Sequence, residues 1–561
     1  MRRWSETAER VAATSRTSEK VRILAEYLRT LTPAELPTAV TFFTGRPFPE
    51  RDPRVLGLGW AAIGDAVQAE ADADPGALGR AYDRSSDLGQ AVFDLLTESS
   101  RRPSGELPSL TDVRDAFAAI AAASGAAAKT AHLRTLLWRG DPLVAKYLVK
   151  VMGGDMRIGL REGNLEAAIA AAFGRPLPAV QWAGMLTGDL GHTAELARDD
   201  RLDEAELTLF RPLKSMLASP AADVAEVTSR LGTPVWVEDK YDGIRAQLHR
   251  QGGETRLYSR DLHDVSGQFP EVIAAAADLA WSGIFDGELL AWRDGTALPF
   301  QQLQGRLGRK RPSAAVLAAT PVIFVAFDLL ASGTGDTPPE PLLRVPLRER
   351  RAGLEQLGLA ARPGFGLSRL ETAASEAELE DRFTAARARG NEGLMVKDPE
   401  SGYTPGRRGF GWLKLKRPLA TLDCVVVGVE VGHGKRHGVL SDYTFAVRDD
   451  RPEAPHPLAT IGKAYSGLTD AELATMTRWF TDHTISIHGR CRLVEPTVVV
   501  EVAFDVIQRS RRHASGYALR FPRIARLRDD KGPDEIDRLS TVAALEARLS
   551  VPARVAVETS A

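Results

Sequence analysis

The chain has 561 residues, of which 44% are hydrophobic and 26% are charged, and its formal net charge is −2. A chain of this length is too long for one hydrophobic core and divides into about three or four domains. The composition is that of a globular protein, and no apolar run is long enough to span a bilayer, which excludes an integral membrane protein.

The start of the chain, MRRWSETAER, carries arginines but lacks the apolar core of a secretory signal. We therefore expect a cytoplasmic protein, associated with the nucleoid if the cell is bacterial. The two cysteines, Cys424 and Cys491, are too few for a four-cysteine zinc site and do not indicate a framework of disulfides. Both are expected to be buried as small apolar residues.

Residues 1–203 are rich in alanine and leucine at helical spacing. In SEKVRILAEYLRTL the apolar Val21, Leu24, Leu28 and Leu31 recur every three or four residues. This spacing predicts an amphipathic helix with one buried face. We predict an all-α domain over residues 1–203.

Residues 204–417 alternate between strand-like and helix-like segments. GIFDGELLAW and PVIFVAFDLL are rich in β-branched and aromatic residues, whereas SEAELEDRFTAARARG has the composition of an exposed helix. The segment SGTGDTPPEP, from Ser332 to Pro341, is predicted to be a surface loop because glycine, proline and small polar residues dominate it. This part of the chain is predicted to be an α+β domain.

Residues 418–561 consist mainly of short strand-like runs, among them LDCVVVGVEVG, DYTFAVRDD and TVVVEVAFDVI, separated by turn-forming residues. A small β-barrel of about five strands, of the OB-fold type, fits this pattern. From Arg509 to Lys531 basic residues outnumber acidic ones. Such a run is either a solvated face or part of a phosphate-binding surface.

One lysine stands out in the stretch VEDKYDGIRAQLHR. Lys240 follows an alternating apolar run and directly precedes Tyr241, Asp242 and Gly243. A lysine at the end of a buried strand usually has a function, because burial disfavours its charged form. An amine attacks phosphorus only when neutral, a state that partial burial and nearby cations favour. The alternative is an exposed lysine before a simple turn.

Five further stretches follow in order, each at the edge of a strand-like run: LYSRDLHD, FDGELLAW, FVAFDLL, EGLMVKD and GWLKLKR. With the Lys240 stretch they match the ordered motifs of the covalent nucleotidyltransferases. The chain resembles the ATP-dependent DNA ligases of the three-domain type found in archaea, some bacteria and eukaryotic nuclei. The resemblance covers nearly the whole chain and is strongest from Val237 to Lys416, whereas the tail after about Ala543 matches nothing.

The resemblance implies a nucleotide site. Lys240 would be the nucleophile that becomes covalently adenylated, and Glu238 would meet the exocyclic amine of adenine. Glu288 would accept a hydrogen bond from the ribose, and Phe327 would stack on the base, a contact that needs no hydrogen bond. Outside this context Phe327 would be interpreted as a core aromatic residue and Glu288 as a surface carboxylate.

The resemblance also implies a set of phosphate-binding cations: Arg245, Arg260, Arg408, Lys414 and Lys416. Arg245 and Arg260 would contact the ribose as well, and later the 5′-phosphate of the nick. Glu392, together with Glu288, would bind a divalent ion, Mg²⁺ or Mn²⁺, through carboxylate oxygens. Nucleotidyl transfer requires mainly positioning and cations around phosphate oxygens, which agrees with these residue types.

The basic run near the end of the chain has a counterpart in the same family. In SGYALRFPRIARLRDDK the arginines Arg520, Arg523 and Arg526 recur every three residues between apolar ones. This segment resembles the last motif of the ligases, which faces the β- and γ-phosphates of ATP during self-adenylation. The barrel is then expected to move and clasp DNA. The sequence does not determine which arginine has which role.

The stretch from Tyr147 to Gly174 resembles the helical DNA-binding domain of the larger ligases. In it Arg157 and Arg161 each stand two residues before a glycine. Small residues beside cations allow the backbone to approach the sugar-phosphate of DNA closely. The alternative is a helix-ending turn on an α-helical scaffold.

The implied activity is ATP-dependent sealing of nicks in double-stranded DNA, by a monomer, without a membrane. Three alternatives remain. An RNA ligase or capping enzyme shares the lysine chemistry, but a capping enzyme has no evident use for a helical DNA-binding domain. An NAD-dependent DNA ligase carries a four-cysteine zinc site, which two cysteines cannot form. The third is a clamp that binds nicks without sealing them. The sequence does not distinguish replication, repair and recombination, nor does it identify protein partners.

Overall fold

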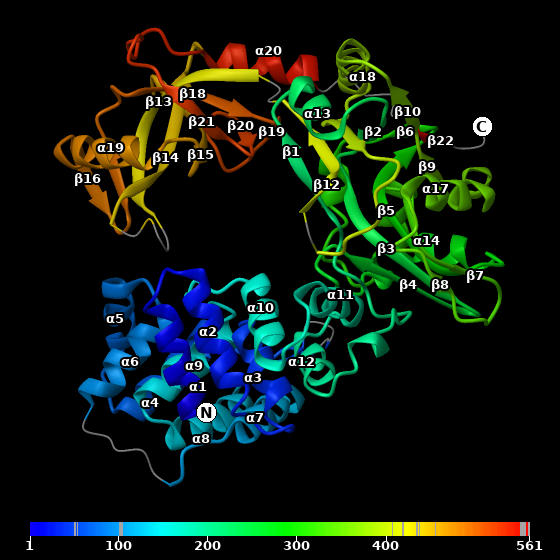
Figure 1. Cartoon of the computed structure of the whole chain (residues 1–561). Helices are drawn as coiled ribbons and strands as arrows, with labels where there is room; N and C mark the ends of the chain where they lie inside the picture. Colours follow the sequence, from blue (N-terminus) through cyan, green and yellow to red (C-terminus); the bar gives the residue numbers. More distant parts are fainter. Residues whose placement is uncertain are drawn as a thin grey trace.

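The computed structural model describes residues 1–561 except 50, 51, 53, 100–104, 407, 418, 419, 433–435, 437, 455, 550–556 and 559–561. Three lobes follow one another along the chain: a helical region, a central region with two large sheets and a C-terminal region rich in strands (Figure 1). Each has its own buried hydrophobic cluster. In the described residues no helix is long and apolar enough to cross a bilayer.

The N-terminal region is built from helices connected by short turns and loops. The helix expected around Val21 is present as α2, which begins at Thr17 and ends at Leu28. A short 3₁₀ turn at Leu202–Glu204 follows the last helix of this region. The helices are α1 (Arg2–Ala12), α2 (Thr17–Leu28), α3 (Leu36–Phe43), α4 (Trp60–Ala71), α5 (Ala77–Ser85), α6 (Leu88–Glu98), α7 (Leu110–Ala122), α8 (Ala126–Arg139), α9 (Pro142–Gly153), α10 (Glu162–Phe173), α11 (Leu177–Thr187) and α12 (Leu190–Arg198).

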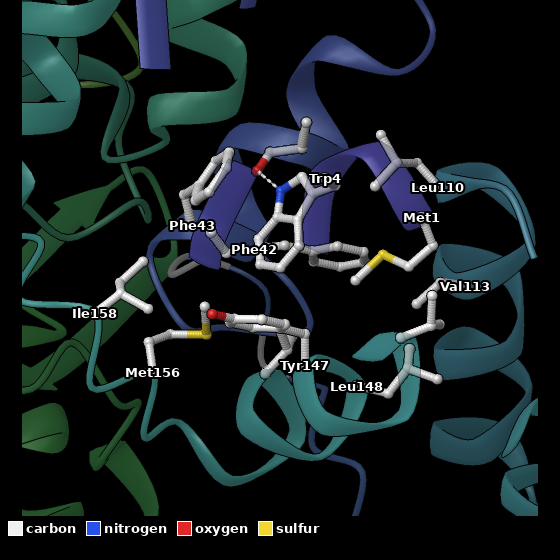
Figure 2. Close-up of a cluster of buried hydrophobic side chains, with 14 of the residues drawn as sticks. Met1, Trp4, Phe42, Phe43, Leu110, Val113, Tyr147, Leu148, Met156 and Ile158 are labelled. Carbon is white, nitrogen blue, oxygen red and sulfur yellow. Dashed lines mark hydrogen bonds between the residues drawn. The ribbon is translucent and has the colours of Figure 1, made fainter. Parts of the chain in front are cut away.

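An aromatic cluster around Trp4 joins α1, α3 and α9 (Figure 2). Trp4 is fully buried and stacks on Phe43 with 4.5 Å between ring centroids. It meets Phe42 and Tyr147 edge-on, and its indole Nε1 donates to the carbonyl of Ala39 at 3.0 Å. Edge-on aromatic pairs contribute about 0.5–1.5 kcal/mol beyond their buried area. The cluster therefore packs three helices from separate parts of the sequence into one body.

Residues 205–216 connect the helical region to the first strand of the central region. The side-chain amide of Gln247 exchanges two hydrogen bonds with the backbone of Leu213, at 2.6 and 3.0 Å. The Nδ1 atom of His249 accepts a hydrogen bond from the N–H of Phe210 at 3.1 Å. Burial lowers the pKa of His249 to about 3, so the ring is neutral and can accept. The connection is thus bonded to the central region.

The central region contains two sheets. One has the strand order β1-β12-β11-β2-β10, and the other has β22-β9-β7-β5-β3-β4, with β6 and β8 on β5 and β7. Helices surround them. The elements are β1 (Leu217–Ala221), α13 (Val224–Leu231), β2 (Val235–Lys240), β3 (Ile244–Gln251), β4 (Glu254–Ser259), α14 (Pro270–Ala276), β5 (Ser282–Arg293), β6 (Thr296–Ala297), α15 (Phe300–Gln304), α16 (Ala314–Ala319), β7 (Val322–Gly333), β8 (Glu340–Pro341), α17 (Leu347–Gln356), β9 (Phe365–Ser368), β10 (Leu370–Ala373), α18 (Glu376–Ala388), β11 (Gly393–Lys397) and β12 (Arg408–Leu415).

β1 and β12, the first strand of the central region and the last one before the C-terminal region, are neighbours in the smaller sheet. β1 and β12 are parallel, with Leu217 opposite Arg408 and Ala221 opposite Leu415. Because the two strands are parallel, the chain enters β1 at one end of this pair and leaves β12 at the opposite end. The helical region and the C-terminal region are attached at these two ends of the strand pair.

The C-terminal region is mainly β. Its larger sheet has the order β15-β14-β13-β17-β16, and β18 pairs with both β13 and β21, while β19 and β20 form a separate pair. The elements are β13 (Ala420–Val431), β14 (Leu440–Arg448), β15 (Leu458–Ala464), α19 (Asp470–Asp482), β16 (Thr484–His488), β17 (Cys491–Val494), β18 (Val499–Phe504), β19 (Val506–Arg509), β20 (Tyr517–Arg520), β21 (Arg523–Leu527), α20 (Leu539–Leu549) and β22 (Val557–Glu558).

The structure differs from the sequence-based expectations in three places. The segment from Ser332 to Pro341 is not wholly a loop, because its two ends pair as strands β7 and β8, and main-chain pairing needs no apolar side chains. Cys424 is buried as expected, but Cys491 is only half-buried. The strand β22, far beyond the last predicted strand, pairs with β9 of the central region. The boundaries at 203/204 and 417/418 stay predictions.

Candidate active site

The smaller central sheet has one apolar and one polar face, because side chains alternate along each strand. Val235 and Val237 of β2 join a buried cluster with residues of β11 and β12. Glu238 and Lys240 alternate with them and therefore project from the opposite face. Lys240 is the last residue of β2, as the sequence predicted.

The strand register brings residues from distant motifs together on this polar face. In β11, Gly393 is opposite Lys240 and Met395 is opposite Glu238. In the next strand, β12, Lys414 is opposite Met395. Opposite residues in an antiparallel pair lie on the same face of a sheet. Glu238, Lys240, Met395 and Lys414 thus form one continuous surface.

The larger sheet supplies the second wall. Arg245 of β3 is opposite Glu288 of β5. Gly243 lies in the turn between β2 and β3, where a Cβ atom would come 2.5 Å from the carbonyl oxygen of Leu289. A side chain at Gly243 would therefore clash with backbone, which explains the glycine after Asp242.

A cavity of about 420 Å³ lies between the two sheets. This volume falls in the range of about 300–1,000 Å³ common for small-molecule sites. The cavity gathers most of the residues that the sequence predicted for nucleotide binding. Those in its lining are Glu238, Lys240, Arg245, Arg260, Glu288, Phe327, Glu392, Lys414, Lys416 and Arg520.

Lys240 forms an ion pair with Glu392 in the cavity. Its Nζ lies 2.5 Å from Glu392 Oε2, and both side chains are about one-fifth exposed, at 23% and 21%. The backbone N–H of Glu392 also donates to the carbonyl of Lys240 at 2.9 Å. The candidate nucleophile and this carboxylate are therefore held together through both side chain and backbone.

Glu288 is a half-buried carboxyl group with an altered protonation equilibrium. Burial raises its pKa to about 8, although Lys240 and Arg245 partly oppose this effect. At neutral pH the group is therefore mostly protonated, so it can form hydrogen bonds with a ribose hydroxyl as donor or acceptor. A protonated carboxyl is a poor metal ligand, so this protonation state favours the ribose role of Glu288 over its metal role.

The guanidinium of Arg245 is already bonded to protein groups. Its Nη2 lies 2.6 Å from Asp286 Oδ2, and its Nη1 donates to the carbonyl of Met216 at 2.6 Å. Burial disfavours the charged guanidinium, but Asp286 and Tyr403 outweigh it and raise the pKa of Arg245. Arg245 is therefore a fixed charge in the wall of the cavity rather than a mobile side chain.

Phe327 is half-buried and offers its ring to the cavity. It packs edge-on against Trp412, with 6.2 Å between ring centroids. The Nζ of Lys397 lies 4.9 Å from its centroid. Lys397 is not among the residues assigned from the sequence, although it ends the apolar strand GLMVK in the way that Lys240 ends β2. That shared pattern is the signal that would have found it.

The remaining cations of the set take different positions. Lys416 pairs with Asp505 of the C-terminal region, with 2.7 Å between Nζ and Oδ2. Lys414 lines the cavity, and Arg260 is exposed at its rim. The side chain of Arg408 lies outside the described part of the structure.

The three C-terminal arginines do not share one face. Arg520 lines the cavity, and its Nη1 lies 3.4 Å from Asp242 Oδ2. Arg523 and Arg526 are exposed and do not line the cavity. β20 ends at Arg520, Phe521 adopts a left-handed conformation with φ 54°, and β21 begins at Arg523. This turn separates arginines that are regularly spaced in the sequence.

Arg157 and Arg161 lie in the helical region, in the turn between α9 and α10. Arg157 is exposed and bonds to Asp155, with 2.7 Å between Nε and Oδ2, and to the carbonyl of Ser86. Arg161 is exposed and lines a separate cavity of about 280 Å³ together with Lys214. Neither residue reaches the cavity that contains Lys240.

Within the described residues, no group of three or more histidine, cysteine, aspartate or glutamate side chains is arranged to hold a metal ion. The acidic groups that line the Lys240 cavity include Glu238, Glu288 and Glu392. A magnesium site of one or two carboxylates completed by phosphate oxygens remains compatible with this arrangement.

Comparison with known proteins places the chain in a family. Models described as "DNA ligase N terminus", "ATP dependent DNA ligase domain" and "ATP dependent DNA ligase C terminal region" match residues 1–170, 215–416 and 436–531. A "Probable DNA ligase" from Koribacter versatilis is 46% identical over 95% of this chain and 94% of its own length. The chain belongs to the family of ATP-dependent DNA ligases. The resemblance inferred from the motifs is therefore confirmed.

Further ligase relatives agree with this assignment. A "DNA ligase" from Methanopyrus kandleri is 36% identical over 96% of this chain and 97% of its own length. A "Probable DNA ligase" from Opitutus terrae is 46% identical over 97% of this chain, which spans 62% of that relative's length. The solved structure Pmar-Lig_PreS3 superposes on this chain with a TM-score of 0.60 at 16% sequence identity. The superposition covers 94% of this chain and 99% of the Pmar-Lig_PreS3 chain, so the two share a fold.

The three-part architecture is that of the ATP-dependent DNA ligases. The helical N-terminal region, the central adenylation domain and the strand-rich C-terminal region follow the same order as the three family matches. Most residues that line the Lys240 cavity lie inside the match to the ATP dependent DNA ligase domain, whereas Arg520 and Phe521 lie inside the match to the C terminal region. A lysine that carries AMP is typical of this family.

Proposed function

We propose that this ligase seals nicks in duplex DNA with ATP, through an AMP group carried by Lys240. The observation that carries the proposal is the position of Lys240 in the 420 Å³ cavity, whose lining also includes Arg260, Lys414, Lys416 and Phe327. Aromatic stacking and cations are what a nucleoside triphosphate requires of a site.

In the first step the neutral amine of Lys240 attacks the α-phosphorus of ATP. A phosphorus–nitrogen bond forms, the bond from the α-phosphorus to the bridging oxygen breaks, and pyrophosphate leaves. The ammonium that pairs with Glu392 first becomes the neutral amine, and the Glu392 carboxylate at 2.5 Å is within hydrogen-bond reach to accept that proton. A second proton leaves to water when the phosphorus–nitrogen bond forms. Lys414 and Lys416 neutralise charge on the phosphate oxygens.

In the second step an oxygen of the 5′-phosphate at the nick attacks the phosphorus of the lysyl-AMP, and the bond to Lys240 breaks. The 3′-hydroxyl then attacks the 5′-phosphorus, so that a phosphodiester forms and AMP leaves. Arg260, which is exposed at the rim of the cavity, would meet the 5′-phosphate.

The nucleoside is recognised by groups on both walls. Glu238 accepts a hydrogen bond from the exocyclic amine of adenine, Phe327 stacks on the base, and Glu288 bonds to the ribose. Arg245 contributes positive charge from its fixed position beside Asp286, and Arg408 adds a phosphate contact.

A divalent ion, Mg²⁺ or Mn²⁺, is part of the proposal. Glu392 would hold it together with phosphate oxygens of the substrate, and a carboxylate donor fits such an ion. Glu288 would assist only in its ionised form. When bound, the ion neutralises phosphate charge. Glu392 is bonded to Lys240 here, so the ion and the ammonium compete for the same carboxylate.

The C-terminal region is proposed to be an OB-fold barrel with two positions. In the first it lies against the adenylation domain, where Arg520, helped by Arg523 and Arg526, faces the β- and γ-phosphates. In the second it moves to clasp DNA, while Arg157 and Arg161 contact the sugar-phosphate backbone from the helical region. We propose that the enzyme acts as a monomer on DNA in the cytoplasm, at the nucleoid if the cell is bacterial.

Two assays test the proposal. Incubation with ATP labelled at the α-phosphate should transfer label to the protein, and a nicked DNA duplex should be sealed with ATP but not with NAD. A clamp without activity would bind the nick and take no label. Sealing of nicked RNA in preference to nicked DNA would support an RNA ligase instead.

A further inference from the structure

Lys397 is the most deeply buried cation in the wall of the Lys240 cavity among the described residues. Its side chain is 1% exposed, and its Nζ donates to Glu238 Oε2 at 2.6 Å. An ammonium that leaves water is costly unless a carboxylate or another polar group compensates it. The Glu238 side chain is itself only 5% exposed. The ammonium of Lys397 and the carboxylate of Glu238 therefore compensate each other's cost of burial.

The strand register explains why these two side chains meet. Lys397 is opposite Trp236 in the β2–β11 pair, and Glu238 is two residues further along β2. Residues that are diagonal in this way lie on one face, within reach of long side chains. On β12 the residue opposite Lys397 is Trp412, and the Nζ lies 4.3 Å from that ring. The ammonium is thus held between a carboxylate and aromatic rings.

The two oxygens of Glu238 have different surroundings. Oε2 accepts the short bond from Lys397. Oε1 lies 3.8 Å from Arg351 Nη1, a distance that is longer than a hydrogen bond. Oε1 therefore keeps the capacity to accept a hydrogen bond from a ligand in the cavity that Glu238 lines.

We propose that Lys397 is a positioning residue that sets the selectivity of the cavity for a purine with an amino group at position 6. It acts through Glu238, by holding the carboxylate in place so that Oε1 can accept a hydrogen bond from the base. An ionised carboxylate accepts hydrogen bonds and cannot donate them, so it favours a 6-amino group. The inference rests on the proposed role of Glu238 in adenine binding.

The test compares two nucleotides that differ at one position: ATP, and purine riboside triphosphate, which has hydrogen in place of the amino group. The rate constant over KM for formation of the covalent protein–nucleotide adduct is measured by intact mass. A hydrogen bond to a charged acceptor predicts that the wild-type chain prefers ATP by about 10- to 100-fold. Lys397→Met should reduce the reaction with ATP and leave that with the purine riboside nearly unchanged, so the preference falls to about 1- to 3-fold.

Four variants make the result specific. Glu238→Ala should lose the preference to the same extent, and the double variant should lose no more than either single one. Lys397→Arg keeps the charge and should keep most of the preference. Lys150→Met is the matched control, because Lys150 is a buried lysine paired with Asp87 at 2.5 Å in the helical region. It should lower the melting temperature without changing the preference.

Each outcome decides one point. If Lys397→Met slows both nucleotides equally, Lys397 only supports the fold and the inference is wrong, while the role of Glu238 stands. If the wild-type chain shows no preference and Glu238→Ala changes nothing, the proposed adenine contact fails and the inference fails with it. Should Lys397→Met not fold, as judged by circular dichroism, Lys397→Gln replaces it and the same outcomes apply.

Discussion

Lys416 Nζ lies 2.7 Å from Asp505 Oδ2, so that a lysine of the Lys240 cavity is bonded to an acid of the C-terminal region. The pair joins the two regions across the cavity, next to the contact between Arg520 and Asp242. Phosphate oxygens of a bound nucleotide would have to share Lys416 with Asp505 or take the place of Asp505. The same bond also helps to hold the C-terminal region against the adenylation domain.

Asp505→Asn should therefore slow self-adenylation about 2- to 5-fold, because a partly exposed ion pair is worth up to about 1 kcal/mol. Sealing of pre-adenylated nicks, which does not use this closed arrangement, should be unchanged. Glu501→Gln is the control, since it breaks the pair with the exposed Arg526. Equal slowing of both reactions by Asp505→Asn would contradict a role in closure.

Lys240→Ala should abolish transfer of label from ATP to the protein and the sealing of ordinary nicks, because no other side chain takes its position at the end of β2. Binding to nicked duplex, measured by gel shift, should be retained, since one cation among many is lost. The variant should also seal pre-adenylated nicks. Label on the Lys240→Ala protein would show that the nucleophile lies elsewhere.

Phe327→Ala should weaken ATP binding about tenfold or more, because stacking of a base on an aromatic ring contributes about 1–3 kcal/mol. The dependence of adenylation on ATP concentration measures this, and DNA binding should not change. Tyr465→Ala, at an aromatic residue that is 62% exposed, serves as the control. An unchanged KM for ATP in folded Phe327→Ala would refute the stacking role.

Arg520→Ala should slow self-adenylation by about 10- to 100-fold, as expected for loss of a charged contact to the leaving pyrophosphate. Phosphodiester formation on pre-adenylated nicks should change much less. Arg523→Ala and Arg526→Ala should have smaller effects on adenylation, because both side chains are exposed away from the cavity. If all three variants only weaken DNA binding and its salt dependence, the segment is a backbone-binding patch.

The raised pKa of Glu288 leads us to expect that the stability of the folded chain depends on pH. Its pKa is raised to about 8 in the folded chain, against about 4.3 for an unfolded one. The stability contributed by the protonated group is complete below pH of about 4 and is lost as the pH rises through about 8. The melting temperature of the wild-type chain relative to Glu288→Gln should therefore fall between pH 5 and about 8.5. The exposed Glu453→Gln should show no such trend.

The sequence predicted the residues around the nucleophile better than the contacts between regions. Lys240 was recognisable because a charge ends an apolar strand, and the resemblance to the ligase motifs pointed to Glu238 beside it. The pairing of Glu238 with Lys397 depends on the register of two strands that lie far apart in the chain, which no local pattern fixes. Arg520 and Arg526 diverge because Phe521 adopts a left-handed conformation, unusual for a non-glycine residue.

The parallel pairing of β1 with β12 fixes where the two outer regions are attached to the central region. The two strands run side by side, so the connections to the helical region and to the C-terminal region leave the adenylation domain at opposite ends of the same strand pair. In the proposed movement onto DNA, the two outer regions would turn about attachments at opposite ends of this strand pair. One region could then stay on the DNA while the other turns between successive reactions.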